Sequence, residues 1–164
     1  MPATAALPEK AGTPFIGRDD VLAAAKPLFA QPGARLITIT GPAGVGKTRL
    51  ATELMRIHCE AAGRIETVVE LAALEYPDAL DAELARTAGI AVMAGEPASV
   101  AVDRWLKDRR ILILLDNAEH LLGIGPRIAA WLAEAPELRI IVTSRQRLKL
   151  TFETELELQP LETK

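Results

Sequence analysis

The sequence has a single cysteine, few aromatic residues and no long apolar run. One cysteine among 164 residues excludes an internal disulfide and fits a reducing compartment. Aromatic residues make up only 4%, so Leu, Ile, Val and Ala must fill the core. No stretch approaches the roughly 20 apolar residues that span a bilayer. Residues 1–13 lack the basic and apolar regions of a signal peptide. We therefore expect a cytoplasmic protein without membrane contact.

Neither sign of charge dominates the chain. The formal net charge is −3 and the pI is near 5.5. No basic stripe or helix-turn-helix pattern stands out, so we expect no direct nucleic-acid contact. A chain of 164 residues can form one domain with a sizeable core. We expect residues 1–14, rich in Ala and Pro, to be a flexible lead-in, and residues 15–164 to form that domain.

The most informative pattern is GPAGVGKT at residues 41–48. It fits the phosphate-binding pattern G-x-x-x-x-G-K-[ST], with the fixed positions taken by Gly41, Gly46, Lys47 and Thr48. Glycines let backbone N–H groups come close to phosphate oxygens, and the N-terminus of a following helix adds unpaired donors. Lys47 would bring a charge to the outer phosphates, and the Thr48 hydroxyl would bind Mg²⁺.

The flanking segments support this interpretation. Residues 35–40 form a short β-branched run typical of a buried strand. Downstream, Leu50, Leu54 and Ile57 recur at i, i+4 and i+7, which predicts a helix over about residues 48–61. The alternative is a glycine-rich turn that binds no ligand, and a strand before the loop with a helix after it argues against that.

A second pattern lies about 70 residues later. Residues 111–115 are all apolar, which predicts a strand buried on both faces, and Asp116 follows directly. A carboxylate at the end of such a strand would lie beside the ligand crevice and could hold Mg²⁺ through water. Glu119 is the better candidate base, because the amide of Asn117 cannot accept a proton. A capping or solvated role fits each of these side chains as well, and His120 fits a structural role.

The end of the chain carries two further strand patterns. Residues 139–143 predict a strand, and Arg145 stands just beyond it. From there its guanidinium could reach the terminal phosphate and report whether that phosphate is present, although a solvated arginine is the common alternative. Residues 152–158 alternate between acidic and less polar residues, which is typical of a half-exposed strand near a sheet edge.

With these residues in view, the sequence resembles the signal-transduction ATPases with numerous domains, the NB-ARC-like P-loop ATPases. It looks closest to the bacterial branch that couples such a module to transcriptional control. The resemblance covers nearly the whole chain and rests on residues 15–19, 36–51, 114–120 and 142–145.

The resemblance implies a three-layer α/β P-loop NTPase fold, with a five-stranded, mainly parallel sheet in the order 2-3-4-1-5. It implies ATP or ADP together with Mg²⁺ as cofactors. The implied nucleotide-binding residues are Ile16, Gly17, Arg18, Gly41, Ala43, Gly44, Val45, Gly46, Lys47, Thr48 and Arg49. The implied metal-binding residues are Thr48 and Asp116. The candidate catalytic residues are Lys47, Asp116, Glu119 and the phosphate sensor Arg145.

The chain departs from the family pattern in two ways. Many relatives have two acids at the end of the Asp116 strand, where this chain has Asp116 and Asn117, so we expect slow hydrolysis with an unassigned base. The family also continues into helical and winged-helix domains, which would be the partners of this module, with a homo-oligomer possible on activation. We therefore predict an ATP/ADP switch excised from a larger regulator. The alternatives are a non-hydrolysing ADP-bound scaffold and a small-molecule kinase.

Overall fold

The computed structural model describes residues 19–25, 27–28 and 33–160. Over these residues the chain forms a five-stranded sheet in the order β2-β3-β4-β1-β5, and all four pairs of neighbouring strands are parallel. The strands are β1 (Leu36–Thr40), β2 (Ile65–Glu70), β3 (Ile111–Asp116), β4 (Arg139–Ser144) and β5 (Thr154–Glu157). The predicted fold and strand order are confirmed. The predicted lead-in at residues 1–14 lies outside the described residues.

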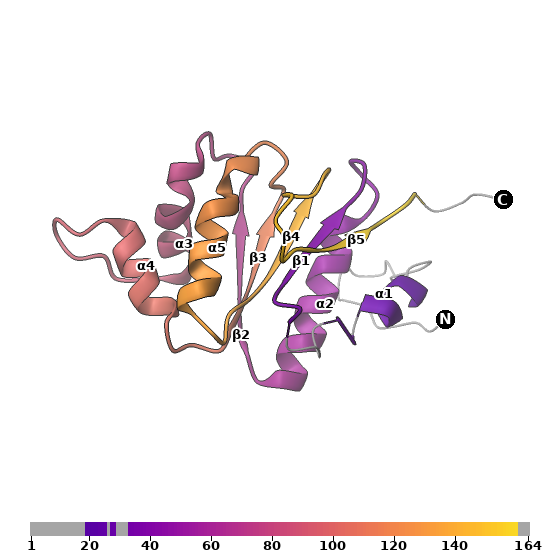
Figure 1. Cartoon of the computed structure of the whole chain (residues 1–164), viewed down its shortest axis with the longest axis horizontal. Helices are drawn as coiled ribbons and strands as arrows, with labels where there is room; N and C mark the ends of the chain where they lie inside the picture. The colour runs from indigo at the N-terminus through magenta and orange to yellow at the C-terminus, as the bar shows by residue number, and fades with distance from the viewer. Residues whose placement is uncertain (1–18, 26, 29–32, 161–164) are drawn as a thin grey trace.

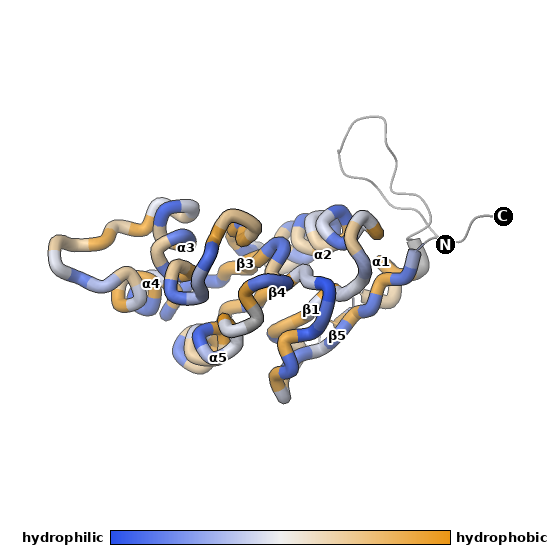
Figure 2. Tube along the Cα trace, turned by 90° about the horizontal axis from the view of Figure 1, so that it is seen from above, coloured by the Kyte–Doolittle hydropathy of each residue, from blue (hydrophilic) through white to orange (hydrophobic). Residues whose placement is uncertain are grey.

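Helices cover both faces of the sheet and give three layers (Figure 1). Figure 2 shows α2 and α5 on opposite sides of the strands. The α-helices are α1 (Asp19–Ala25), α2 (Lys47–Ala62), α3 (Leu80–Ala88), α4 (Ala98–Leu106) and α5 (Gly125–Glu134). Two short 3-10 helices are η2 (Pro77–Ala79) and η3 (Leu122–Ile124). Within the described residues, no helix combines the length and the apolar character needed to cross a membrane.

Alternate residues of the central strands pack against the two helical layers. In β3, Leu112 and Leu114 belong to the core beneath α1 and α2. Ile111, Ile113 and Leu115 belong to the core beneath α3, α4 and α5. Because both faces are covered, every one of these side chains is buried, and this explains the uninterrupted apolar run in the sequence.

The parallel arrangement gathers the functional segments at one edge of the sheet. The phosphate loop follows β1, Asp116 ends β3, and Arg145 follows β4. The register pairs Thr40 of β1 with Ser144 of β4, and Glu70 of β2 with Asp116 of β3. The carboxyl ends of four strands therefore meet at the same level, where an open α/β sheet binds its ligands.

Arginines gather at the opposite, amino edge of the sheet. Arg35, Arg64 and Arg110 each precede a strand, and Arg139 begins β4. Burial, and then repulsion from neighbouring arginines, lowers the pKa of Arg64. The Glu137 carboxylate lies 3.5 Å from Arg64 Nη2 and 3.7 Å from Arg110 Nε. Folding thus creates a basic row that the linear sequence does not display.

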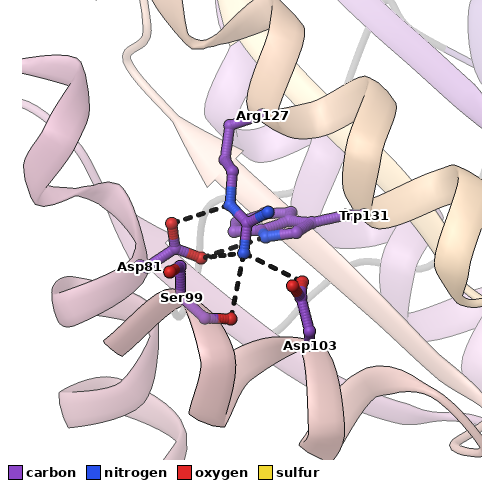
Figure 3. A network of polar contacts seen from close by, with 5 residues as sticks. All are labelled: Asp81, Ser99, Asp103, Arg127 and Trp131. Carbon is purple, nitrogen blue, oxygen red and sulfur yellow. Dashed lines mark hydrogen bonds and ion pairs between the residues drawn. The ribbon is translucent and has the colours of Figure 1, made fainter. Parts of the chain in front are cut away.

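A second charged cluster fastens the three helices on one face together (Figure 3). Arg127 of α5 donates from Nε to Asp81 Oδ2 of α3 at 2.7 Å, and from Nη2 to Asp103 Oδ1 of α4 at 2.9 Å. The same Nη2 donates to the backbone oxygen of Ser99 at 3.1 Å. The indole N–H of Trp131 donates to Asp81 Oδ1 at 3.1 Å. Asp81 is 8% exposed, so its carboxylate is hydrogen-bonded by these donors rather than by bulk water.

We expect Arg127→Met to lower the free energy of unfolding by about 3 kcal/mol, because the buried Asp81 carboxylate would lose its cation. Urea denaturation followed by circular dichroism measures this. Arg86→Met is the matched control, because Arg86 pairs with Glu83 on the exposed face of α3 and should change little. Adding Asp81→Asn to Arg127→Met should recover part of the loss, and equal effects of the two arginine changes would contradict the assignment.

Candidate functional site

The phosphate loop adopts a backbone that requires glycine. Gly44 and Gly46 have φ angles of +78° and +99°, in the left-handed region that other residues rarely adopt. Gly46 is also the N-cap of α2. At Gly41, with φ of +153°, an added Cβ would lie 2.5 Å from the backbone oxygen of Leu158. The loop is therefore pressed against the segment that follows β5, and the Leu158 N–H donates to Thr40 O at 2.7 Å.

Lys47 closes the loop from within. Its Nζ donates to the backbone oxygens of Gly41 and Pro42, each at 2.9 Å. The residue is 8% exposed although it carries a charge. An ammonium has three donors, so it can hold the loop and still bind an anion. The backbone of the loop is thus folded around the Lys47 ammonium.

The Asp116 carboxylate joins three elements at the edge of the sheet. It accepts from Thr48 Oγ1 of α2 at 2.9 Å and from Thr143 Oγ1 of β4 at 2.6 Å. Burial raises the pKa of Asp116, the two hydroxyl donors oppose this shift, and repulsion from Glu70 adds to it. Asp116 is 4% exposed, so its carboxylate lies at the floor of the site.

These features fit a nucleotide with Mg²⁺. Cβ atoms added at Gly44 and Gly46 would meet open space, so the backbone there is accessible to phosphate oxygens. Both residues lie at the N-terminus of α2, whose dipole favours anions. The Thr48 hydroxyl and the Asp116 carboxylate are in contact, and Mg²⁺ binds such oxygens together with phosphates and water.

The other predicted residues of the loop differ in their surroundings. Ala43 is exposed at the tip of the loop. Val45 is half-buried and packs on the core beneath α2, so part of its role is structural. Arg49 is half-buried in the first turn of α2. The predicted adenine contacts, Ile16, Gly17 and Arg18, lie outside the described residues.

The residues after Asp116 take distinct positions. Asn117 has a φ of +65°, which asparagine tolerates better than most residues, and its backbone N–H donates to Thr143 Oγ1 at 2.8 Å. Glu119 is half-buried, and within the described part of the chain its Oε1 has no hydrogen-bond partner. His120 Nε2 lies 2.7 Å from Leu74 O, which fits its structural interpretation.

Arg145 lies at the carboxyl edge, one residue beyond the Ser144 that pairs with Thr40. Its side chain is exposed and makes no hydrogen bond or ion pair with the part of the chain that the structure describes. Its position therefore suits a cation that meets a ligand. Its role as a sensor, like that of Glu119 as a base, stays a prediction.

Sequence reasoning missed two residues of this site. Thr143 holds Asp116, and Glu70 accepts from Asn117 Nδ2 at 3.2 and 3.3 Å. Each stands at or near the carboxyl end of a strand, where polar residues are candidates for a site. That positional signal was present in the sequence, but the strand register was needed to bring both residues to Asp116.

We expect Gly41→Ala to destabilise the protein by about 1–3 kcal/mol, because the new methyl group would overlap the backbone of Leu158. Thermal unfolding measures the loss, and nucleotide affinity should fall with it. Gly33→Ala is the control, since a Cβ there meets nothing within 4 Å. If the two variants melt alike, the close approach at Gly41 is not a constraint.

We expect Asp116→Asn to raise the thermal midpoint of the nucleotide-free protein at neutral pH. Because burial raises the pKa of Asp116 in the folded state, the ionised carboxylate destabilises the fold above that pKa. The difference from wild type should shrink as the pH falls through the raised pKa toward the usual carboxyl range. Asp108→Asn, at an exposed position, is the control. A lower midpoint for Asp116→Asn at neutral pH would contradict this prediction.

Comparison with known proteins agrees with this geometry. A family profile described as an AAA domain matches residues 31–161. A protein of Mycobacterium tuberculosis, provisionally named an HTH-type transcriptional regulator, is 34% identical over 120 residues. This match covers 73% of the chain but only 13% of that protein, so the chain spans a small part of the relative's length.

Solved structures show the same fold at low identity. The ORC2 protein of Aeropyrum pernix, solved as ADPNP–ADP complexes, superposes with a TM-score of 0.68 at 16% identity. The superposition covers 88% of this chain and 48% of the ORC2 chain. The ORC1 protein of the same organism, solved with DNA, gives a TM-score of 0.59 at 18% identity, covering 85% and 45%. By its sequence match and its P-loop fold, the chain belongs to the AAA domain family.

Proposed function

We propose that this chain is an ATP/ADP-binding regulatory module that hydrolyses ATP slowly and belongs to a larger regulator. The observation that carries the proposal is the geometry of the site: Lys47 holds the phosphate loop, and Thr48 of α2 contacts Asp116 of β3. The choice of an adenine nucleotide rests on the resemblance to the signal-transduction ATPases, because the likeness to ORC2, at 16% identity, concerns the fold alone. The relative named as a transcriptional regulator supports a regulatory setting.

In this proposal each side chain has a separate task. The backbone of residues 41–47 and the Lys47 ammonium bind the phosphates. Mg²⁺, when bound, neutralises phosphate charge, with Thr48 and Asp116 as its protein ligands. Arg145 lies exposed at the same edge of the sheet. From there its guanidinium would contact the terminal phosphate of bound ATP, which ADP lacks. Such a differential contact is what a nucleotide switch needs.

The partners in this proposal are the helical and winged-helix domains of the signal-transduction ATPases that the sequence resembles. The chain spans 13% of the regulator-like relative, which leaves ample sequence for such domains in that protein. The likeness to the DNA-bound ORC1 protein concerns the fold alone. The absence of direct nucleic-acid contact by this domain therefore stays a prediction.

A non-hydrolysing scaffold that keeps ADP as part of its structure is the second candidate. One observation favours it: the residue after Asp116 is Asn117, whose amide donates to Glu70 and cannot accept a proton. Release of phosphate from ATP distinguishes the two candidates, because both bind nucleotide but only the switch turns it over.

We expect the chain to bind Mg-ATP and Mg-ADP, and Lys47→Ala to weaken ATP binding by at least about 10-fold through loss of a charge-assisted contact. Isothermal titration calorimetry measures both affinities. Lys107→Ala, at an exposed position beyond α4, is the charge-matched control and should bind as wild type does. If wild type does not bind, or if Lys47→Ala binds equally well, the proposal is overturned.

A further inference from the structure

Glu70 brings a carboxylate to the site from a strand that carries no recognised motif. It is the last residue of β2 and pairs in register with Asp116 of β3. Its Oε1 accepts from the backbone N–H of Ala72 at 2.9 Å and from Asn117 Nδ2 at 3.2 Å. The Oε2 atom is 3.3 Å from the same amide nitrogen. Two donors therefore fix the direction of this exposed carboxylate.

Glu70 can accept a proton, which the amide of Asn117, the residue after Asp116, cannot do. Hydrolysis needs a group that orients the attacking water and takes its proton, and the amide of Asn117 can do only the first. Asn117 Nδ2 lies 3.2 Å from Glu70 Oε1 and 3.4 Å from Asp116 Oδ2, so the amide stands between two carboxylates. By donating to both, the Asn117 amide allows the Glu70 and Asp116 carboxylates to lie side by side at the carboxyl edge of the sheet.

We propose that Glu70 is the residue that accepts the proton of the attacking water; this assignment rests on the proposed ATP hydrolysis. The water oxygen forms a bond to the γ-phosphorus, and the bond from that phosphorus to the β–γ bridging oxygen breaks. Its electron pair leaves with ADP. One proton of the water passes to a Glu70 oxygen and then to the released phosphate, so water and ATP give ADP and phosphate.

Glu119, the base predicted from the sequence, is in a different setting. It is half-buried, and its Oε1 is shut off from solvent without a hydrogen-bond partner among the described residues. A water must reach a base to give up its proton, and the enclosure of that oxygen opposes this. The exposed carboxylate of Glu70 is open to water and lies next to Asp116, which would hold the metal.

The experiment is single-turnover hydrolysis of γ-labelled ATP with excess full-length chain and Mg²⁺, alongside calorimetric affinities for ATP and ADP. We expect Glu70→Gln to slow phosphate release by about 100-fold or more while both affinities stay unchanged. Asn117→Ala should slow it less, because it removes only a positioning donor. Glu66→Gln, on the exposed amino end of the same strand, is the matched control. Phosphate release by Lys47→Ala gives the background rate.

The outcomes separate this inference from the proposed function. If Glu119→Gln removes turnover and Glu70→Gln does not, the base is Glu119 and the assignment is wrong. Nucleotide binding without any turnover by wild type overturns the assignment and leaves the nucleotide-bound scaffold. Absence of binding by wild type overturns the proposed function itself. Loss of turnover in Glu70→Gln with intact binding and a melting midpoint no lower than that of wild type supports the assignment.

Discussion

The buried carboxylate of Asp116 is the contact on which the site depends. Asp116 is the last residue of β3, and its carboxylate accepts hydrogen bonds from Thr48 of α2 and Thr143 of β4. One side chain therefore links three elements of the site. Burial of a charge costs free energy, and the rise in its pKa records that cost. The fold keeps the charge because the hydroxyls of Thr48 and Thr143 offset part of the cost, and because a divalent cation would offset more.

The sequence predicted the parts of the site that are encoded locally. The phosphate loop is one contiguous pattern, and its strand, its helix and Asp116 follow from periodicity and burial within short windows. The strand order came from resemblance to a family and was confirmed. Glu70 and Asn117 are 47 positions apart, so no window could join them. Only the register between β2 and β3 places Glu70 beside Asp116.

The arginines at the amino edge of the sheet are likewise brought together only by the fold. A net charge of −3 gives no sign of the basic row, and its four arginines are far apart along the chain. Parallel strands bring Arg35, Arg64, Arg110 and Arg139 together because each stands at the start of its strand. Arg35 Nε donates to Leu138 O at 3.2 Å, and Arg64 donates to Glu137 O. The row thus ties down the loop that enters β4.

Placing the proton acceptor on β2 separates nucleotide binding from hydrolysis. The residues proposed to bind the phosphates and Mg²⁺ follow β1, begin α2 and end β3, in the central part of the fold. Glu70 comes from a strand at the edge of the sheet, where Ile65 and Val68 are 52% and 43% exposed. Nucleotide binding and hydrolysis therefore depend on different elements. A shift of β2 could change the rate of hydrolysis while the nucleotide stays bound. The proposed regulatory role would use this separation, because ATP that is bound but not yet hydrolysed is a state that other domains could recognise.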